Sequence, residues 1–308
     1  MTRHFLRDDD LSPVEQAEVL ALAKALKSAR HQARPFEGPR AVAIIFDKPT
    51  LRTQASFTAG VAELGGYPML VDGSLARIGV RESVADSARV LGRMVSAVVW
   101  RTYGQERIDE MAAYAGVPVV NALTDRFHPC QLLADLQTIE EHKGTLAGLT
   151  VAFLGDAASN MSHSFLLACA TAGMHVRVSG PDGFGPDADV LATAERIAGE
   201  TAGSASYVVD PVAAVTDADV VVTDTWVSMG KEGEAEERSR PFLPYAVDTP
   251  LLGHAKADAI VMHCLPAYRG KEIAADVIDG PQSVVWDEAE NRLHAQKALL
   301  AWLMEHQT

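Results

Sequence analysis

Basic and hydroxyl side chains follow an apolar segment near the N-terminus, in the stretch FDKPTLRTQASF at residues 46–57. Thr50 and Thr53 offer hydroxyl groups, and Arg52 offers a guanidinium group between them. If a helix begins here, the N–H groups of its first turn and its dipole attract an anion, and Arg52 can add a bidentate contact to a phosphate. The alternative is that Thr50 only caps the helix and that Arg52 is solvated. The stretch alone leaves both possibilities open.

Other side chains able to bind charge or move protons also follow apolar segments. Taken singly, each has an ordinary structural explanation as a surface arginine, a buried histidine or a small buried cysteine. Random surface placement would scatter them, so we interpret them as one set. Its members are Arg101 in SAVVWR, His128 and Gln131 in FHPCQ, Asn160 in GDAASNM, Asp224 in VVVTD, Ser228 and Met229 in VSMG, Cys264 in VMHC and Arg292 in AENRLH.

Short apolar segments alternate with helix-like stretches along the chain, which predicts parallel sheets with helices on their faces. Ligands of such sheets bind beyond the carboxyl ends of the strands, where the polar residues lie. The fold class is therefore α/β. Strands are expected at 41–46, 67–72, 96–101 and 117–122 in the first half, and at 149–156, 174–180, 218–224, 258–264 and 283–288 in the second.

Several connecting segments carry helix signals. In the first, Ser12 is the expected N-cap, Pro13 takes the first helical position and Glu15 completes a capping box. Two further helices are expected at residues 129–143, joining the two halves, and at residues 291–306. The polar stretch 226–244, which contains Gly and Pro, is longer than an ordinary connection and predicts a lid-like loop.

Composition limits the class of protein. A chain of 308 residues predicts two domains of about 150 residues each. A formal net charge of −14 argues against a nucleic-acid partner or an anionic membrane surface. The scattered Cys130, Cys169 and Cys264 favour a reducing compartment over a disulfide framework. No apolar run approaches the roughly 20 residues of a membrane span, so we expect a cytoplasmic protein.

Common cofactor motifs are absent from the sequence. It contains no GxGxxG after the first strand of either half, and no GxxxxGK[ST], HExxH or GxSxG motif. These absences disfavour NAD binding, P-loop nucleotide hydrolysis, zinc proteolysis and α/β-hydrolase chemistry. His254, His263 and His294 lack metal-ligand spacing. We therefore expect neither a metal nor an organic cofactor.

Six motifs, in order, make essentially the whole chain resemble the ornithine carbamoyltransferases of the aspartate/ornithine carbamoyltransferase superfamily: TLRT, WRT, HPCQ, DTWVSMG, HCLP and ENRLHAQKALL. Aspartate carbamoyltransferases have Pro where Cys264 stands and lack the SMG loop. The resemblance implies two doubly wound parallel-sheet domains joined by long helices, with the C-terminal helix packing back on the N-terminal domain. Residues 1–140 with 290–308 would bind carbamoyl phosphate, residues 141–289 would bind ornithine, and the catalytic unit would be a trimer.

The resemblance also implies roles for individual residues. The phosphate would be cradled by Thr50, Leu51, Arg52 and Thr53. The carbamoyl oxygen would be polarised by Arg101, His128 and Thr53, while the carbamoyl amide would contact Gln131 and the backbone carbonyl near Cys264 and Leu265, with Arg292 beside it. Ornithine would be bound by Asn160, Asp224, Ser228 and Met229, and its δ-amine approached by Asp224 and Cys264. The catalytic set is then Arg101, His128, Asp224 and Cys264.

The chain departs from the family pattern S-T-R-T-R at Leu51 and Gln54. Arg77 and Arg81 stand where the family often has Gln and Lys, on a loop that reaches a neighbouring subunit's phosphate site. These two cations would compensate for Gln54, or else they are solvated loop residues. The leading hypothesis is citrulline formation for arginine biosynthesis. The alternatives are transfer to putrescine or an acylated ornithine, and an inactive paralogue that only binds carbamoyl phosphate.

Overall fold

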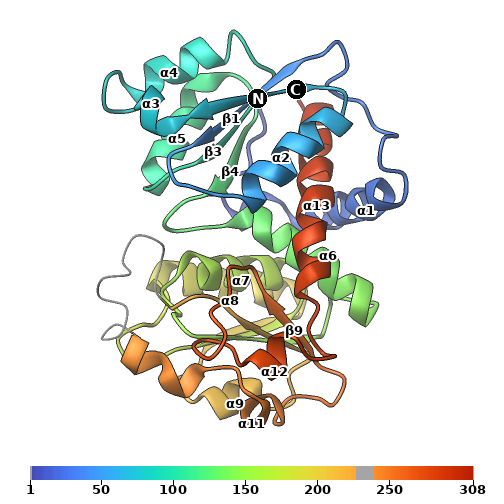
Figure 1. Cartoon of the computed structure of the whole chain (residues 1–308), viewed down its shortest axis with the longest axis vertical. Helices are drawn as coiled ribbons and strands as arrows, with labels where there is room; N and C mark the ends of the chain where they lie inside the picture. The colour runs from blue at the N-terminus through green and yellow to red at the C-terminus, as the bar shows by residue number, and fades with distance from the viewer. Residues whose placement is uncertain (1, 227–238, 308) are drawn as a thin grey trace. The chain divides into compact units, whose positions relative to one another are not determined.

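We analysed a computed structural model, which describes residues 2–226 and 239–307. The chain divides into two compact units (Figure 1): unit 1 comprises Met1–Gln137 and Glu290–Thr308, and unit 2 comprises Thr138–Ala289. Both boundaries fall inside long helices, α6 (Pro129–Lys143) and α13 (Val285–Glu305), which carry the chain from one unit to the other. No helix in the described ranges is long and apolar enough to cross a membrane.

Unit 1 is built on a parallel sheet with the strand order β2-β1-β3-β4. The chain moves from β1 to one side for β2 and then returns to the other side of β1 for β3. The carboxyl ends of β1 and β3 therefore flank a topological switch point, where ligands bind in open parallel sheets. The strands are β1 (Ala41–Phe46), β2 (Tyr67–Asp72), β3 (Ala97–Arg101) and β4 (Val119–Leu123).

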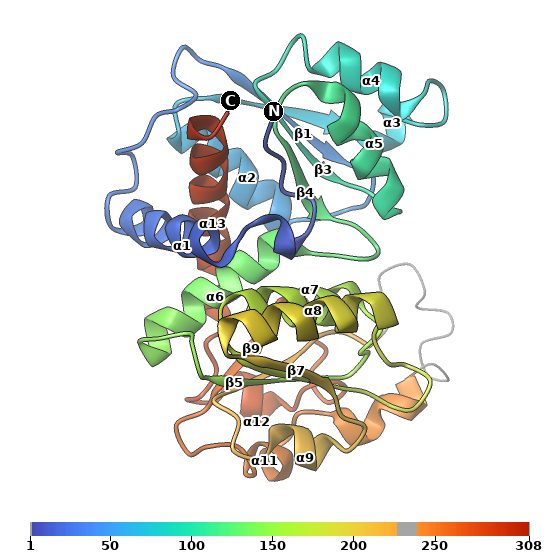
Figure 2. The same ribbon diagram turned by 180° about the vertical axis from the view of Figure 1, so that it is seen from behind.

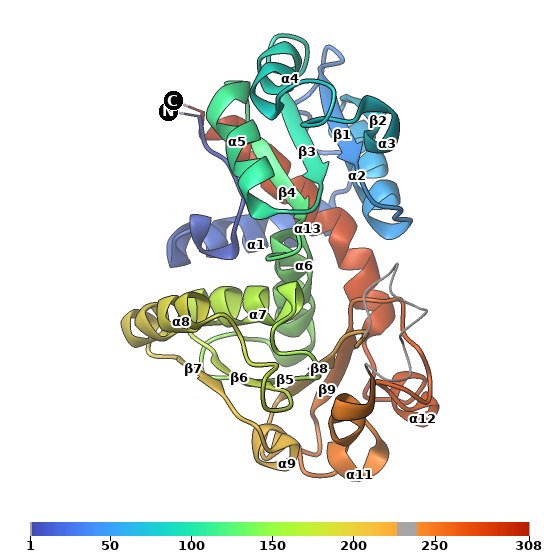
Figure 3. The same cartoon turned by 90° about the vertical axis from the view of Figure 1, so that its left-hand side faces the viewer.

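Helices cover both faces of this sheet. In Figure 3, α4 and α5 lie on one side of β3 and α2 lies on the other. The central strand β3 is buried throughout because it is covered on both faces, and its Trp100 packs with Ile108 and Met111 of α5. The unit contains the short η1 (Asp8–Asp10), α1 (Pro13–Ser28), α2 (Arg52–Glu63), α3 (Gly73–Ala76), α4 (Val84–Leu91) and α5 (Gln105–Ala115). The capping box of Ser12 and Glu15 on α1 is confirmed.

The C-terminal helix α13 packs against α1 and α2 within unit 1, which confirms that part of the predicted fold. Lys297 is fully buried and donates hydrogen bonds to the Glu63 carboxylate, 2.7 Å away, and to the carbonyl of Arg30. A Cβ on Gly60 of α2 would meet the Lys297 side chain at 3.0 Å, so the helices approach closely where Gly60 stands. Trp302 donates to Glu18 of α1.

Unit 2 contains a second parallel sheet, with the strand order β7-β6-β5-β8-β9. Figure 2 shows α7 and α8 on one face and α9, α11 and α12 on the other. The carboxyl ends of β5 and β8 flank its switch point. The strands are β5 (Thr150–Leu154), β6 (His175–Ser179), β7 (Ser204–Tyr207), β8 (Val220–Thr223) and β9 (Ile260–His263); the helices are α7 (Asn160–Thr171), α8 (Ala188–Thr201), α9 (Pro211–Val215), η3 (Arg240–Tyr245), α11 (Thr249–Leu252) and α12 (Ala275–Ile278).

The predicted α/β class and both parallel sheets are confirmed, but two details differ. The strand predicted at 283–288 is wrong, because α13 begins at Val285 and only Ser283 pairs, in an isolated bridge with Val261. A short apolar run does not separate a strand from the start of a buried helix. The edge strand β7 was not predicted, since SASY has few strand-favouring residues. Of the loop predicted at 226–244, residues 227–238 lie outside the described residues.

Candidate active site

The helix α2 begins just beyond the end of β1. The helix begins at Arg52 after the N-cap residue Leu51, whose side chain makes no cap hydrogen bond. The alternative in which Thr50 serves only as the cap is therefore wrong. Leu51 is 77% exposed, so it offers the site its backbone and not its side chain. The arrangement suits an anion at the helix N-terminus, with the hydroxyl of buried Thr53 beside it.

Arg101 ends β3 at a local irregularity of the sheet. Trp100 pairs with Asn121 of β4, but the next residue, Arg101, pairs with Leu123, so Ala122 is the extra residue of a bulge. Bulges re-aim side chains and are common beside active sites. The Arg101 side chain is nonetheless buried, because only 7% of the residue is exposed. A buried guanidinium group at a switch point is well placed to meet an anionic ligand.

His128 stands directly before α6, after a turn in which Thr124 and Phe127 bond to one another. The imidazole is buried, and burial lowers its pKa well below the usual value of 6.5, with further lowering by the positive charges of Arg292, Arg101 and Arg52. The ring is therefore neutral at neutral pH, and a neutral imidazole can donate one N–H to a developing negative charge. The charges of three arginines in unit 1 thus act on one neutral histidine.

Gln131 and Arg292 are oriented by neighbours within unit 1. The side-chain amide nitrogen of Gln131 donates to Asp135, one turn along α6, at 2.8 Å. Its amide oxygen consequently faces away from Asp135. Arg292 of α13 donates from Nη2 to Thr53 Oγ1 at 2.8 Å, so a buried guanidinium group from the end of the chain contacts the start of α2.

Asp47 holds together the segments that carry these groups, and the sequence did not single it out. Its N–H donates to the carbonyl of Arg101, and its Oδ2 accepts from Thr102 Oγ1 at 2.6 Å and from Trp100 Nε1 at 3.2 Å. Arg107 lies 3.5 Å from the same oxygen and donates to the carbonyl of Ile78 at 2.7 Å. Asp47 stands inside FDKPTLRT, but no local pattern reveals a partner 60 positions away in sequence.

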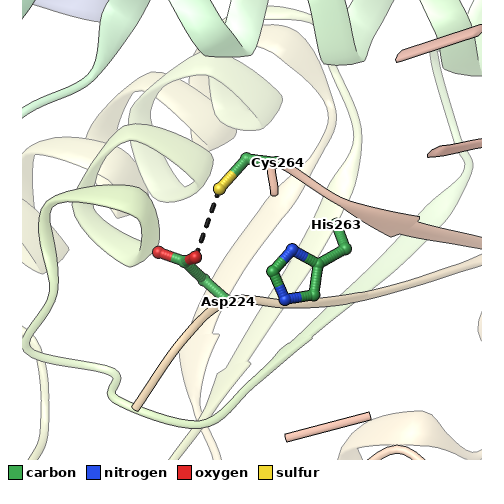
Figure 4. Close-up of side chains that lie close together, drawn as sticks. All are labelled: Asp224, His263 and Cys264. Carbon is green, nitrogen blue, oxygen red and sulfur yellow. Dashed lines mark hydrogen bonds between the residues drawn. The ribbon is translucent and has the colours of Figure 1, made fainter. Parts of the chain in front are cut away.

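In unit 2, Asp224 and Cys264 meet at the carboxyl ends of neighbouring strands (Figure 4). The Cys264 thiol donates to Asp224 Oδ1 at 3.2 Å, and the Thr225 N–H donates to the same oxygen at 2.7 Å. Both contacts use Oδ1 of the Asp224 carboxylate. Asn160 begins α7, just beyond β5, with Ser159 as its N-cap. Three predicted residues thus follow the adjacent strands β5, β8 and β9.

One group of side chains in unit 2 has metal-ligand chemistry. Potential ligand atoms of Asp224, His263 and Cys264 lie within 4.8 Å of one another. However, His263 Nδ1 accepts the N–H of Leu265 at 2.9 Å, and its Nε2 faces Glu272 at 3.3 Å. A metal ion could take the imidazole only by breaking one of these contacts. The geometry favours a hydrogen-bonded network over a set of ligands.

The remaining predicted residues are distributed as follows. Arg77 and Arg81 are exposed on the segment after α3, and neither side chain makes a hydrogen bond or ion pair with the described residues. Arg77 has a left-handed backbone, with φ 48°. Ser228 and Met229 lie outside the described residues. Leu265 follows Cys264 directly and also has a left-handed backbone, with φ 57°.

Two family models match the chain over nearly all of its length. Residues 3–141 match the carbamoyl-P binding domain of aspartate/ornithine carbamoyltransferase. Residues 147–303 match the Asp/Orn binding domain of the same family.

Relatives named ornithine carbamoyltransferase match this chain over nearly their full length. The chain is 62% identical over 304 residues to the ornithine carbamoyltransferase of Clavibacter sepedonicus, covering 99% of each chain, and 58% identical over 305 residues to that of Mycobacterium leprae, covering 99% of this chain and 100% of the relative. Among solved structures, the ornithine carbamoyltransferase of Pyrococcus furiosus is 45% identical with a TM-score of 0.95, covering 100% of this chain and 98% of that one. The anabolic enzyme of Campylobacter jejuni is 35% identical with a TM-score of 0.92, covering 99% and 100%.

Proposed function

The chain belongs to the aspartate/ornithine carbamoyltransferase family, and from this premise we propose that it transfers the carbamoyl group of carbamoyl phosphate to the δ-amine of L-ornithine. The products are L-citrulline and phosphate, and the proposed role of the reaction is arginine biosynthesis. The observation that carries the proposal is that buried His128 is kept neutral by burial and by the positive charges of Arg292, Arg101 and Arg52, while Arg292 also donates to Thr53 at the start of α2. This set suits a small phosphorylated carbonyl compound, because it supplies both positive charge and a neutral N–H donor.

Unit 1 is the proposed binding unit for carbamoyl phosphate. The phosphate of carbamoyl phosphate would accept hydrogen bonds from the backbone N–H groups of residues Thr50 to Thr53, at the start of α2, and from the Arg52 guanidinium group. Arg101, His128 and Thr53 would donate to the carbamoyl oxygen. The amide oxygen of buried Gln131 would accept an N–H of the carbamoyl amide, and the backbone carbonyls near Cys264 and Leu265 would accept one as well.

Unit 2 is the proposed binding unit for ornithine. Asn160, Asp224, Ser228 and Met229 would hold the α-amino and α-carboxylate groups, and Asp224 with Cys264 would meet the δ-amine. An alkyl ammonium group has a pKa of about 10.4, so the amine must lose a proton before it attacks. The Asp224–Cys264 pair, or a phosphate oxygen of the bound carbamoyl phosphate, can accept this proton.

The reaction proceeds by addition and elimination. The neutral amine attacks the carbamoyl carbon, and the carbonyl oxygen becomes negative in the tetrahedral intermediate. Preorganised donors aimed at such an oxygen are usually the largest catalytic contribution, and Arg101 and His128 are the proposed donors. The attacking nitrogen then loses its second proton to an oxygen of the phosphate group, and the C–O bond to phosphate breaks. The electron pair of that bond leaves with the phosphate, whose charge Arg52 stabilises.

The departures from the family pattern do not argue for an inactive paralogue. The Leu51 side chain points into solvent and Gln54 is also exposed, whereas Arg52 and Thr53 remain at the start of α2.

We also propose a homotrimer in which Arg77 and Arg81 reach a neighbouring subunit's phosphate site, and a cytoplasmic location. The support for the first is that both side chains are exposed and uncommitted to any described residue of their own chain. The support for the second is the reducing compartment that the scattered cysteines favour. Mass photometry tests the oligomeric state. The shared site is tested by mixing Arg81→Ala chains with Arg101→Ala chains, which should recover part of the activity that each variant lacks alone.

The reaction is tested with purified protein, carbamoyl phosphate and a panel of ornithine, putrescine, lysine and N-acetylornithine. Ornithine should give the highest kcat/KM, with citrulline and phosphate formed in equal amounts. A higher kcat/KM for putrescine or N-acetylornithine would show that this compound, and not ornithine, is the preferred substrate. Calorimetric binding of carbamoyl phosphate without any product from the panel would indicate a binding protein instead.

A further inference from the structure

His263 is a buried side chain beside the proposed ornithine site that the mechanism above does not use. It is fully buried at the end of β9 and directly precedes Cys264. The Leu265 N–H donates to its Nδ1 at 2.9 Å. Nδ1 must therefore carry the lone pair, so the ring proton is on Nε2, which faces Glu272 Oε1 at 3.3 Å.

Both neighbours of this ring are themselves fixed. Glu272 is buried, its Oε1 also accepts the N–H of Tyr268, and its carbonyl accepts the N–H of Val247. The His263 backbone N–H donates to the carboxylate of buried Glu288 at 2.9 Å. Hydrogen bonds thus fix both ring nitrogens and the backbone N–H of His263. The one acceptor atom of the ring, Nδ1, accepts the N–H of Leu265.

Leu265 needs such a contact because its backbone is in the left-handed region, at φ 57°. A branched residue without special turn chemistry rarely adopts this conformation, and it persists only where the surroundings enforce it. Cys264 lies between His263 and Leu265, so the bond from the Leu265 N–H back to the imidazole closes a small loop around Cys264. The thiol at the tip of that loop is the one that contacts Asp224 Oδ1.

We propose that His263 is a positioning residue that holds Leu265 in its left-handed conformation and thereby places the Cys264 thiol against Asp224. Glu272 sets the tautomer of the ring. The inference rests on the proposed function, since it assigns His263 a part in presenting the ornithine site. It predicts that the acceptor at Nδ1 matters more than the donor at Nε2.

Two substitutions separate these two atoms. His263→Asn keeps an oxygen acceptor near the position of Nδ1 and loses the donor. His263→Gln keeps an amide donor near Nε2 and loses the acceptor. We expect His263→Asn to retain kcat/KM for ornithine within about fivefold of the native enzyme, and His263→Gln to lose about fiftyfold, mainly through KM for ornithine. His175→Gln, a histidine change on β6, is the matched control and should have no effect.

Inorganic phosphate serves as a probe of unit 1 alone. Its inhibition constant against carbamoyl phosphate should stay unchanged in both His263 variants, because none of the phosphate contacts involves β9. Equal losses in the two variants, or a raised phosphate constant in His263→Gln, would mean general structural damage and would overturn the inference. Circular dichroism and thermal unfolding of each variant report any such damage directly.

Alkylation of Cys264 provides a readout that does not need turnover. Cys130 and Cys169 are buried, so iodoacetamide followed by peptide mass spectrometry reports on Cys264. A thiol that donates to a carboxylate is slow to form the reactive thiolate. We expect His263→Gln to react about tenfold faster than the native protein, and His263→Asn to react at nearly the native rate. If the native protein makes no citrulline, the proposed function fails while this contrast still supports positioning. Identical alkylation rates in the native protein and both variants would refute the positioning role of His263 and would leave the proposed function untouched.

Discussion

Arg292 Nη2 donates a 2.8 Å hydrogen bond to Thr53 Oγ1, although 239 positions separate the two residues. The contact joins the C-terminal helix α13 to the first turn of α2, and both residues are buried. Because Thr53 accepts this bond through its oxygen, its own hydroxyl proton is left to donate elsewhere. The last helix of the chain therefore orients a donor at the proposed carbamoyl-phosphate site.

Thr53→Val should weaken carbamoyl phosphate binding. The substitution keeps the shape of the side chain but removes the acceptor for Arg292, and a hydrogen bond to a charged group contributes about 1.5–3 kcal/mol. KM for carbamoyl phosphate should rise by roughly ten- to a hundredfold, while KM for ornithine stays nearly constant. Thr53→Ser, which keeps the hydroxyl, is the control. Equal KM values for the Val and Ser variants would contradict the role of the hydroxyl.

Arg101→Ala should lower kcat by about a hundred- to a thousandfold, as the loss of an oxyanion donor does in other enzymes. Steady-state kinetics at saturating concentrations of both substrates measures the effect, and circular dichroism checks the fold. The exposed Arg196→Ala on α8 is the matched control and should behave as the native enzyme. A near-native kcat for Arg101→Ala would remove Arg101 from the proposed oxyanion site.

Stability should fall at acid pH in a way that depends on His128. Its pKa in the folded protein lies well below 6.5 because of burial and of the three neighbouring arginines. Between that lowered value and 6.5 the unfolded chain binds a proton that the folded chain does not, so the free energy of unfolding decreases as the pH falls. The loss is at most about 1.4 kcal/mol per pH unit from this group.

Urea unfolding of the native protein and of His128→Gln, at pH 7 and at about pH 5, isolates this contribution from those of other histidines. The native protein should lose more stability than the variant over this interval. Parallel losses in the two proteins would show that His128 titrates normally in the folded state.

Asp47→Asn should destabilise unit 1. The substitution leaves Arg107 without its negative partner in a side-chain network of low exposure, which should cost about 1–3 kcal/mol of unfolding free energy. Asp86→Asn breaks the exposed pair with Arg89 and should cost less than about 0.5 kcal/mol. Urea denaturation compares the two variants. If both cost the same small amount, Asp47 does not organise the network around Thr102 and Arg107.

Restoring the family pattern at Leu51 and Gln54 should change little. The double variant Leu51→Thr, Gln54→Arg introduces side chains at two exposed positions, whereas the phosphate is expected to contact backbone N–H groups and Arg52. KM for carbamoyl phosphate should stay within about threefold of the native value. A tenfold or greater improvement would show that these side chains take part in binding.

Local signals in the sequence were sufficient for most elements. The capping box of Ser12 and Glu15, the apolar run 41–46 and the helix 129–143 all appear where the pattern predicted them. Signals failed where burial and propensity disagree. The edge strand β7 carries few strand-favouring residues, and the apolar residues after Ser283 begin a buried helix in place of a strand.

The sequence by itself determined the α/β class, the parallel sheets and the edge at which polar chemistry collects, because hydrophobic periodicity and the alternation of strand-like with helix-like segments are local properties. Only the tertiary structure decided which of those polar groups meet. The contacts of Arg292 with Thr53, of Asp47 with Arg107 and of His263 with Glu272 join segments without any shared local pattern. Such contacts depend on how helices and strands pack in three dimensions, and that packing is set by the whole core of each unit.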